Sequence, residues 1–117
     1  MTAKEGRLRL ALLLGGATLA AALHPDQPGL DCGQGGRNQI EVNACAALKA
    51  DAVKKRLAAL LAELDGVLQP EVRERLGRVQ ARWAEVRDLD CGWERDLFEG
   101  GSVAPLVYAN CVARQTE

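Results

Sequence analysis

Aromatic residues are scarce in this 117-residue chain, which contains two Trp, one Tyr and one Phe. Strands favour β-branched and aromatic residues, whereas the apolar residues here are mostly Ala, Leu and Val, which suit helices better. A chain of this length is long enough for one domain, and at this size we do not expect a second hydrophobic core. We therefore expect an all-α fold.

The groups that catalysis most often requires are also scarce. His24 is the only histidine, and no glycine-rich phosphate-binding loop is present. Asp88 and Asp90 are two positions apart, so on a helix they project to different sides and form no acid/base pair. None of the four cysteines is close enough to another for the paired spacing of a zinc site. We expect a protein that is not an enzyme and has no cofactor and no metal.

The amino-terminal segment has the pattern of a secretory signal. Basic residues precede an apolar run over residues 10–23, and small residues near Ala22 suit a cleavage site after that position. A retained anchor is the alternative, but a spanning helix needs about 20 predominantly apolar residues, and a segment of that length would include Arg9. We expect residues 1–22 to be a cleaved signal peptide, with no stable membrane insertion afterwards.

Cleavage there would leave a mildly acidic protein. The remaining chain has 12 basic and 15 acidic residues, a net charge of −3. Such a chain lacks the basic footprint of a nucleic-acid-binding protein, but its charge would favour a cationic protein partner.

Four cysteines, Cys32, Cys45, Cys91 and Cys111, remain after the predicted cleavage point. An even number of cysteines in a short exported chain predicts two disulfides and a periplasmic or secreted location. The pairs Cys32–Cys45 and Cys91–Cys111 are favoured because shorter loops close at lower entropic cost. Crossed pairings stay open, because all four cysteines are expected at one end of the fold.

Hydrophobic periodicity divides the rest of the chain into three helices. Residues 23–38 contain prolines and glycines without periodicity and predict an extended lead-in to a helical domain over residues 39–117. One helix is expected over residues 39–68, a second from Pro70 to about Cys91, and a short third over residues 103–114 with Ser102 as its N-cap. The apolar stripe of the first helix contains Ala46, Ala50, Val53, Leu57, Leu60, Leu61, Leu64 and Leu68, and that of the second contains Val72, Leu76, Val79, Trp83 and Val86.

The short connection between the first two helices predicts that they pack against each other as an antiparallel hairpin, braced by the disulfides. Residues 90–101 then read as a loop that offers aromatic and acidic side chains together, as interfaces often do. Alternatively, Trp93 and Phe98 cover the disulfide end of a small core. The candidate partner-binding residues are Asp90, Trp93, Glu94, Asp96, Phe98 and Glu99.

Several of these segments resemble a known family. They are the run from Glu41 through Asn43 to Cys45, the run from Leu76 to Cys91 with its Gln, Trp and Arg-Asp, and the Gly100-Gly101-Ser102 step that leads to Cys111. Together they are similar to the lysozyme inhibitor LprI-like domain family of exported bacterial proteins, over about residues 32–114. The sequence departs from the family at Lys54 and Lys55, where Leu-Asn is usual.

The resemblance implies an exported inhibitor of lysozyme-type peptidoglycan glycosidases that acts by occluding the enzyme's cleft. The alternative is a cell-envelope structural or interaction module without lysozyme activity. Trp83 sits in the apolar stripe, which favours core packing over ligand stacking. Arg87-Asp88 favours a structural ion pair over a partner contact, and Glu41 and Asn43 favour a cap at the helix start. The family-motif residues expected to be structural are Glu41, Asn43, Asp51, Gln80, Trp83, Arg87 and Asp88.

Overall fold

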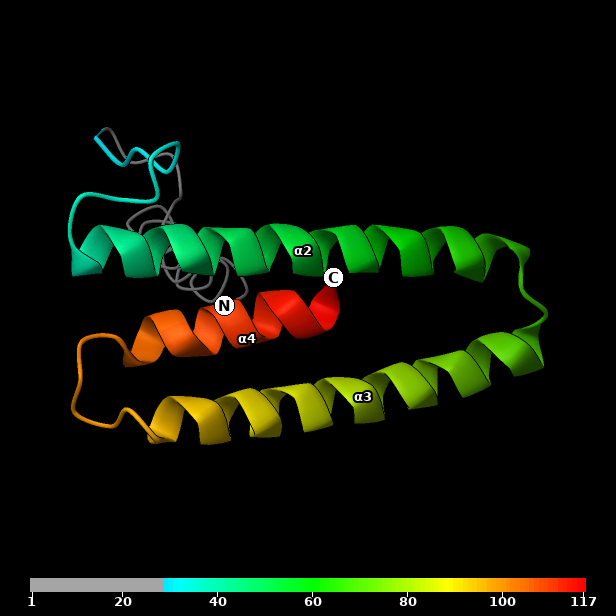
Figure 1. Cartoon of the computed structure of the whole chain (residues 1–117). Helices are drawn as coiled ribbons and strands as arrows, with labels where there is room; N and C mark the ends of the chain where they lie inside the picture. Colours follow the sequence, from blue (N-terminus) through cyan, green and yellow to red (C-terminus); the bar gives the residue numbers. More distant parts are fainter. Residues whose placement is uncertain (1–28) are drawn as a thin grey trace, which may run out of the picture. The chain divides into compact units, whose positions relative to one another are not determined.

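The computed structural model describes residues 29–117, and the regular structure within them is helical throughout. Helix α2 spans Gln39–Val67, α3 spans Pro70–Asp96 and α4 spans Ala104–Thr116 (Figure 1). These three helices confirm the predicted all-α class. The predicted signal peptide and the first part of the lead-in lie outside the described residues. Within residues 29–117, no helix combines the length and hydrophobicity that crossing a membrane requires.

Helix α2 begins at a side-chain cap. The Asn38 side chain accepts a hydrogen bond from the Glu41 backbone N–H at 3.0 Å, and the Glu41 carboxylate in turn accepts one from the Arg37 backbone N–H at 2.9 Å. This reciprocal arrangement is a variant of the capping box. Asn38 is therefore the capping residue, with Glu41 in support. Asn43 does not cap the helix.

Helix α3 begins where the sequence predicts and ends later. Pro70 occupies the first turn after an extended Gln69, a position that suits its fixed φ angle. The helix then continues to Asp96, so the predicted loop over residues 90–101 is wrong in its first half. A single glycine, Gly92, does not stop a helix, whereas Gly100 with a φ of 81° belongs to the turn that does.

Helix α4 starts one residue later than predicted and without a side-chain cap. Val103 is at the N-cap position, so the prediction that Ser102 caps this helix is wrong. Pro105 is tolerated because it lies in the first turn, where its missing N–H would have no partner within the helix.

The packing centre of the domain is α4, which lies between α2 and α3 (Figure 1). It packs against both long helices, while α2 and α3 make almost no direct contact. The predicted direct packing within the hairpin is therefore replaced by a three-helix layer. Most buried side chains are small, which lets α4 approach both neighbours closely. The core contains Ala46, Ala50, Cys91, Ala109, Cys111, Val112 and Ala113.

Inserting α4 changes which parts of the predicted stripes are buried. On α2 it covers Ala46, Ala50 and Val53, whereas Leu60 and Leu64 further along the same stripe stay exposed. On α3 the buried positions are Arg87 and Cys91. Val79 and Val86, which we expected in the core, are 61% and 63% exposed. The bond from Cys91 to α4 fixes the rotation of α3 and turns Val86 away, whereas Val79 borders the open pocket where α4 ends.

Both favoured disulfides are present, Cys32–Cys45 and Cys91–Cys111, each with a Cα–Cα distance of 5.5 Å. Cys91 and Cys111 are fully buried and join α3 to α4 at the centre of the core. Cys32 is exposed, and its bond ties the lead-in to the second turn of α2.

We predict that the two disulfides contribute unequally to stability. Replacing Cys91 and Cys111 with Ala together should lower the free energy of unfolding by about 2–5 kcal/mol, the usual range for a native disulfide. The matched pair Cys32→Ala and Cys45→Ala should cost less, because it frees only a surface segment. Urea unfolding followed by helical circular dichroism measures both, and equal losses would contradict the central role of Cys91–Cys111.

A second prediction concerns two glycines with opposite surroundings. Gly36 has a φ of 100°, and a Cβ there would lie 2.7 Å from the Val42 backbone nitrogen. Gly36→Ala should therefore destabilise the lead-in, at about 1–3 kcal/mol for a strained backbone position. Gly77 lies within α3 with open space around it, so Gly77→Ala should raise stability by up to about 1 kcal/mol. Thermal unfolding of the two variants should shift in opposite directions.

Candidate partner-binding surface

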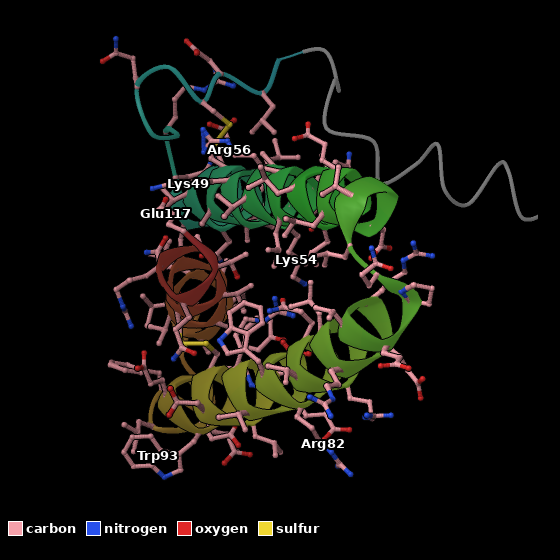
Figure 2. The ribbon with its side chains drawn as sticks, turned by 90° about the vertical axis from the view of Figure 1, so that its right-hand side faces the viewer. Lys49, Lys54, Arg56, Arg82, Trp93 and Glu117 are labelled. Carbon is pink, nitrogen blue, oxygen red and sulfur yellow. A yellow bond between two sulfur atoms is a disulfide. The ribbon has the colours of Figure 1, made fainter. Side chains whose placement is uncertain are left out.

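Large apolar side chains follow one another along the outer side of the second half of α3. Val86, Leu89, Trp93 and Leu97 recur at steps of three and four residues, so they lie on one face of the helix as it runs into the turn. Leu89 is 75% exposed and Trp93 is 64% exposed. Figure 2 shows Trp93 directed away from α2 and α4. Exposed apolar residues in a continuous row are typical of an interaction site.

Carboxylates surround this row. Residues 85–99 contain six acidic side chains and two basic ones, Arg87 and Arg95. Arg87 is buried and pairs with Asp88 at 3.0 Å, so it offsets one of these carboxylates without being exposed itself. The outer end of α3 is therefore both apolar and acidic, a combination suited to a protein partner with a basic surface.

Contacts with other side chains orient five of these six acids, including Glu85 beside Arg82 at 3.2 Å and Asp88 beside Arg87 at 3.0 Å. Arg95 pairs with Asp96 at 3.0 Å, and Arg114 of α4 pairs with Glu94 at 3.4 Å. Gln115 of α4 donates a hydrogen bond to Asp90. Exposed ion pairs contribute little to stability, so their main effect here is to restrict where the carboxylates point.

Phe98 and Glu99 lie beyond the helix, in the turn that leads to α4. The Phe98 backbone N–H donates to the Arg95 carbonyl at 2.9 Å, and the Phe98 side chain is about half exposed. Tyr108, the other aromatic near this end, lies under the Arg95 guanidinium at 5.3 Å. Thus five of the six sequence candidates lie on α3 or immediately beyond it with exposed side chains, and Glu94 is partly covered by Arg114.

The structure adds residues to this surface that the sequence prediction missed. Leu89 and Leu97 were not selected, because residues 90–101 were expected to be a loop and Val86 was assigned to the core. The signal was present in the sequence as the continuation of helical spacing from Val86 to Leu97 past Cys91.

Arg87 links α3 to the end of α4. It is 7% exposed, and its guanidinium lies 5.1 Å from the centre of the Trp83 ring. The same group donates to Asp88 at 3.0 Å and to the Thr116 hydroxyl at 3.4 Å. Thr116 in turn donates to the Val112 carbonyl. This chain of contacts gives the buried charge its partners.

Trp83 and Gln80 lie at the edge of the core, where α4 ends. Together with Leu57, Val79 and Thr116 they line an open pocket of about 220 Å³ between α2 and α3. Trp83 is half-buried, packed against Arg87 on one side and open to this pocket on the other.

The remaining motif residues lie on the first half of α2. The Asn43 amide donates to the Ser102 carbonyl at 2.9 Å and accepts from Gln39, which fixes the turn before α4 to the start of α2. Asp51 is exposed on the same helix.

Glu41 is the one carboxyl of the described residues whose pKa is clearly displaced. Hydrogen bonds from the Arg37 guanidinium, then from the Arg37 backbone N–H, hold the pKa of Glu41 below its ordinary value. A lowered folded-state pKa means that this cap contributes stability above the unfolded pKa of about 4.3. The contribution is lost as pH falls through the folded pKa.

Asp90, Glu94 and Cys111 come close enough together to suggest a metal site. Cys111 is bonded to Cys91, however, and a disulfide sulfur is not the thiolate that binds metals. The two carboxylates are already engaged by Gln115 and Arg114. This cluster therefore does not fit a metal centre.

The fold and this surface define a class, that of a small disulfide-braced helical protein with an exposed aromatic and acidic face. The family model for lysozyme inhibitor LprI matches residues 31–117, and the chain belongs to this family. The match coincides with the compact unit of residues 31–117 that contains all three helices. Neither a curated protein nor a solved structure matches the chain.

We predict that Arg87 is required for stability. Arg87→Ala removes the contacts to Trp83 and Thr116 and leaves a gap in the core, which should cost about 2–4 kcal/mol. Arg56→Ala is the matched control, because Arg56 is also an arginine on a long helix but its side chain is exposed. Its effect should stay within about 0.5 kcal/mol. Similar losses in urea unfolding for both variants would contradict the assignment.

Proposed function

We propose that the chain is an exported inhibitor that binds a lysozyme-type glycosidase and blocks its cleft. Membership of the lysozyme inhibitor family supports the target class. The observation that carries the binding mode is the exposure of Trp93 within an acidic apolar surface on α3.

Occlusion needs no chemistry from the inhibitor. A glycosidase cleaves its substrate between two carboxyl groups that flank the scissile bond, so a side chain placed in that cleft excludes the sugar. Trp93 is suited to this role because a rigid exposed tryptophan is a frequent anchor of protein interfaces. Leu89 and Leu97 extend the apolar contact on either side.

The acidic side chains around Trp93 attract the enzyme as it approaches and orient it in the complex. A cationic enzyme would be attracted to the six carboxylates of residues 85–99, and salt would weaken that attraction. Asp90 and Asp96 lie on opposite flanks of Trp93, so they would fix the register of the complex rather than supply most of its affinity.

The proposal includes export. Two disulfides fit an oxidising compartment, and residues 1–22 have the pattern of a signal peptide that is removed during export. Peptidoglycan and the glycosidases that cleave it lie outside the cytoplasm, so a periplasmic or secreted inhibitor would meet its target there.

The test is lysozyme-catalysed lysis of bacterial cell walls with increasing amounts of the exported, oxidised protein. Wild-type protein should inhibit lysis, and Trp93→Ala should raise the inhibition constant by about 30-fold or more, as loss of an interface anchor does. Ile40→Ala is the matched control, because Ile40 is also a large exposed apolar residue but lies at the start of α2. It should inhibit like the wild type.

The outcomes test the target enzyme and the proposed binding surface separately. Inhibition that Trp93→Ala leaves intact would contradict the assigned surface but not the inhibitor proposal. No inhibition at high micromolar concentration would contradict the proposal itself. The chain would then be an envelope interaction module that leaves lysozyme alone.

A further inference from the structure

The two long helices extend well beyond the end of α4. We name residues 57–67 of α2 and residues 70–83 of α3 the distal arms, which meet at the turn on the side away from the disulfides (Figure 1). At 1.5 Å per residue, these arms are about 16 and 21 Å long, or three to four helical turns each. Because α4 ends at Thr116, no helix within residues 29–117 lies between the arms.

The arms carry the apolar stripes past the point where α4 covers them. Leu57, Leu60, Leu61 and Leu64 continue the α2 stripe that Ala46, Ala50 and Val53 begin. On α3, Val72, Leu76, Val79 and Trp83 form the corresponding row. Leu60 is 53% exposed and Val79 is 61% exposed.

The pocket beside Thr116 shows that the two rows border the same space. Leu57 lines it from α2, and Val79 and Trp83 line it from α3. The arms thus form an apolar cleft with the end of α4 as its inner boundary. Burying both sides of this cleft requires further helices of similar length.

The arms also differ in charge. The α2 arm contains two acids, Glu63 and Asp65, and no basic residue. The α3 arm contains four arginines and two glutamates. One arm is therefore negative and the other positive, which is the pattern expected when each arm lies beside the opposite arm of an identical chain.

We propose that a second copy of this chain occupies the cleft, so that the distal arms of two copies form a four-helix bundle about a two-fold axis. The two tips point in opposite directions, and each α2 arm lies parallel to the α3 arm of the other copy. A contact confined to the turns would bury only one turn of each helix. Stable interfaces bury about 800 Å² per partner, so the arms must overlap along their length.

This arrangement pairs opposite charges. With the arms overlapped along their length, the stretch of α2 that contains Glu63 and Asp65 comes level with the stretch of α3 of the second copy that contains Arg78 and Arg82. Glu63 and Asp65 project to different sides of α2, so one of them faces these arginines. The two-fold axis repeats the pairing on the other side of the bundle. Leu60, Leu64 and Val79 of both copies then lie inside it. The proposal is independent of lysozyme inhibition, because Trp93 and its acidic surroundings lie outside the distal arms.

A charge exchange tests the pairing directly. One variant carries Glu63→Arg and Asp65→Arg, and the other carries Arg78→Glu and Arg82→Glu. In a dimer of either variant alone, each α2 arm lies beside an α3 arm of the same charge. The dissociation constant of that dimer should therefore rise by about tenfold or more. Mixed together, the two variants have opposite charges at both sides, and a heterodimer should form with near wild-type affinity.

Sedimentation velocity over a hundredfold or wider range of concentration, about 1 to 100 μM or more, measures these constants for the exported, oxidised protein. Leu64→Asp within the cleft should shift the protein to monomer. Leu89→Asp on the outer side of α3 is the matched control and should leave association unchanged. Circular dichroism checks that both variants keep their helices.

A wild-type chain that stays monomeric across this range would overturn the proposal. A dimer that Leu64→Asp leaves intact, or charge variants that fail to recover on mixing, would overturn it as well. If Leu64→Asp instead abolishes lysozyme inhibition without any wild-type self-association, the cleft holds the target enzyme rather than a second copy.

Discussion

The Cys91–Cys111 bond is the constraint on which the rest of the domain depends. It is fully buried and holds α4 against α3, while small residues on the opposite side of α4 pack on α2. A core that contains mainly alanine, valine and cystine buries little apolar area, so a covalent link at its centre replaces packing that a larger core would supply. Arg87 and Thr116 add a polar connection at the end of α4.

Placing α4 between the long helices creates both candidate surfaces. The length of α4 determines where it stops covering α2 and α3, and therefore where the distal arms begin. Its bond to Cys91 rotates α3 so that Val86, Leu89 and Trp93 face outward. The α4 residues Arg114 and Gln115 also orient the acids beside Trp93. One short helix thus sets what the two long ones present to partners.

Local features of the sequence predicted much of the fold. Pro70 identified the start of α3, the cysteine spacing favoured the observed disulfide pairs, and the periodicity of α2 gave its extent to within one residue. Ser102 was wrong as a cap, because the helix starts from a turn whose backbone geometry is set by Gly100 and by the contact from Asn43. The chemistry of a side chain shows that it can cap a helix, but not whether the helix begins at that residue.

The packing order of the helices was not predictable in the same way. Two amphipathic helices joined by a short turn ordinarily pack together. Nothing in the apolar stripes of α2 and α3 shows whether each stripe packs against the other long helix or against a third helix. Only the tertiary position of Cys111 decides that α4 enters the gap. Reading residues 90–101 as a loop also hid Leu89 and Leu97, which lie beside the candidate partner-binding residues on α3. The signal peptide and the roles of the proposed binding residues stay predictions.

Amide hydrogen exchange, at a concentration where the chain is monomeric, tests most directly whether α4 organises the domain. The account predicts the slowest exchange in residues 109–113 of α4 and in the segments of α2 and α3 that face them, near Ala50 and Cys91. The distal arms should exchange faster, because no other helix of residues 29–117 covers them. Uniformly slow exchange along α2 and α3 up to the turn at Gln69 would contradict it, since the two long helices would then stabilise each other directly.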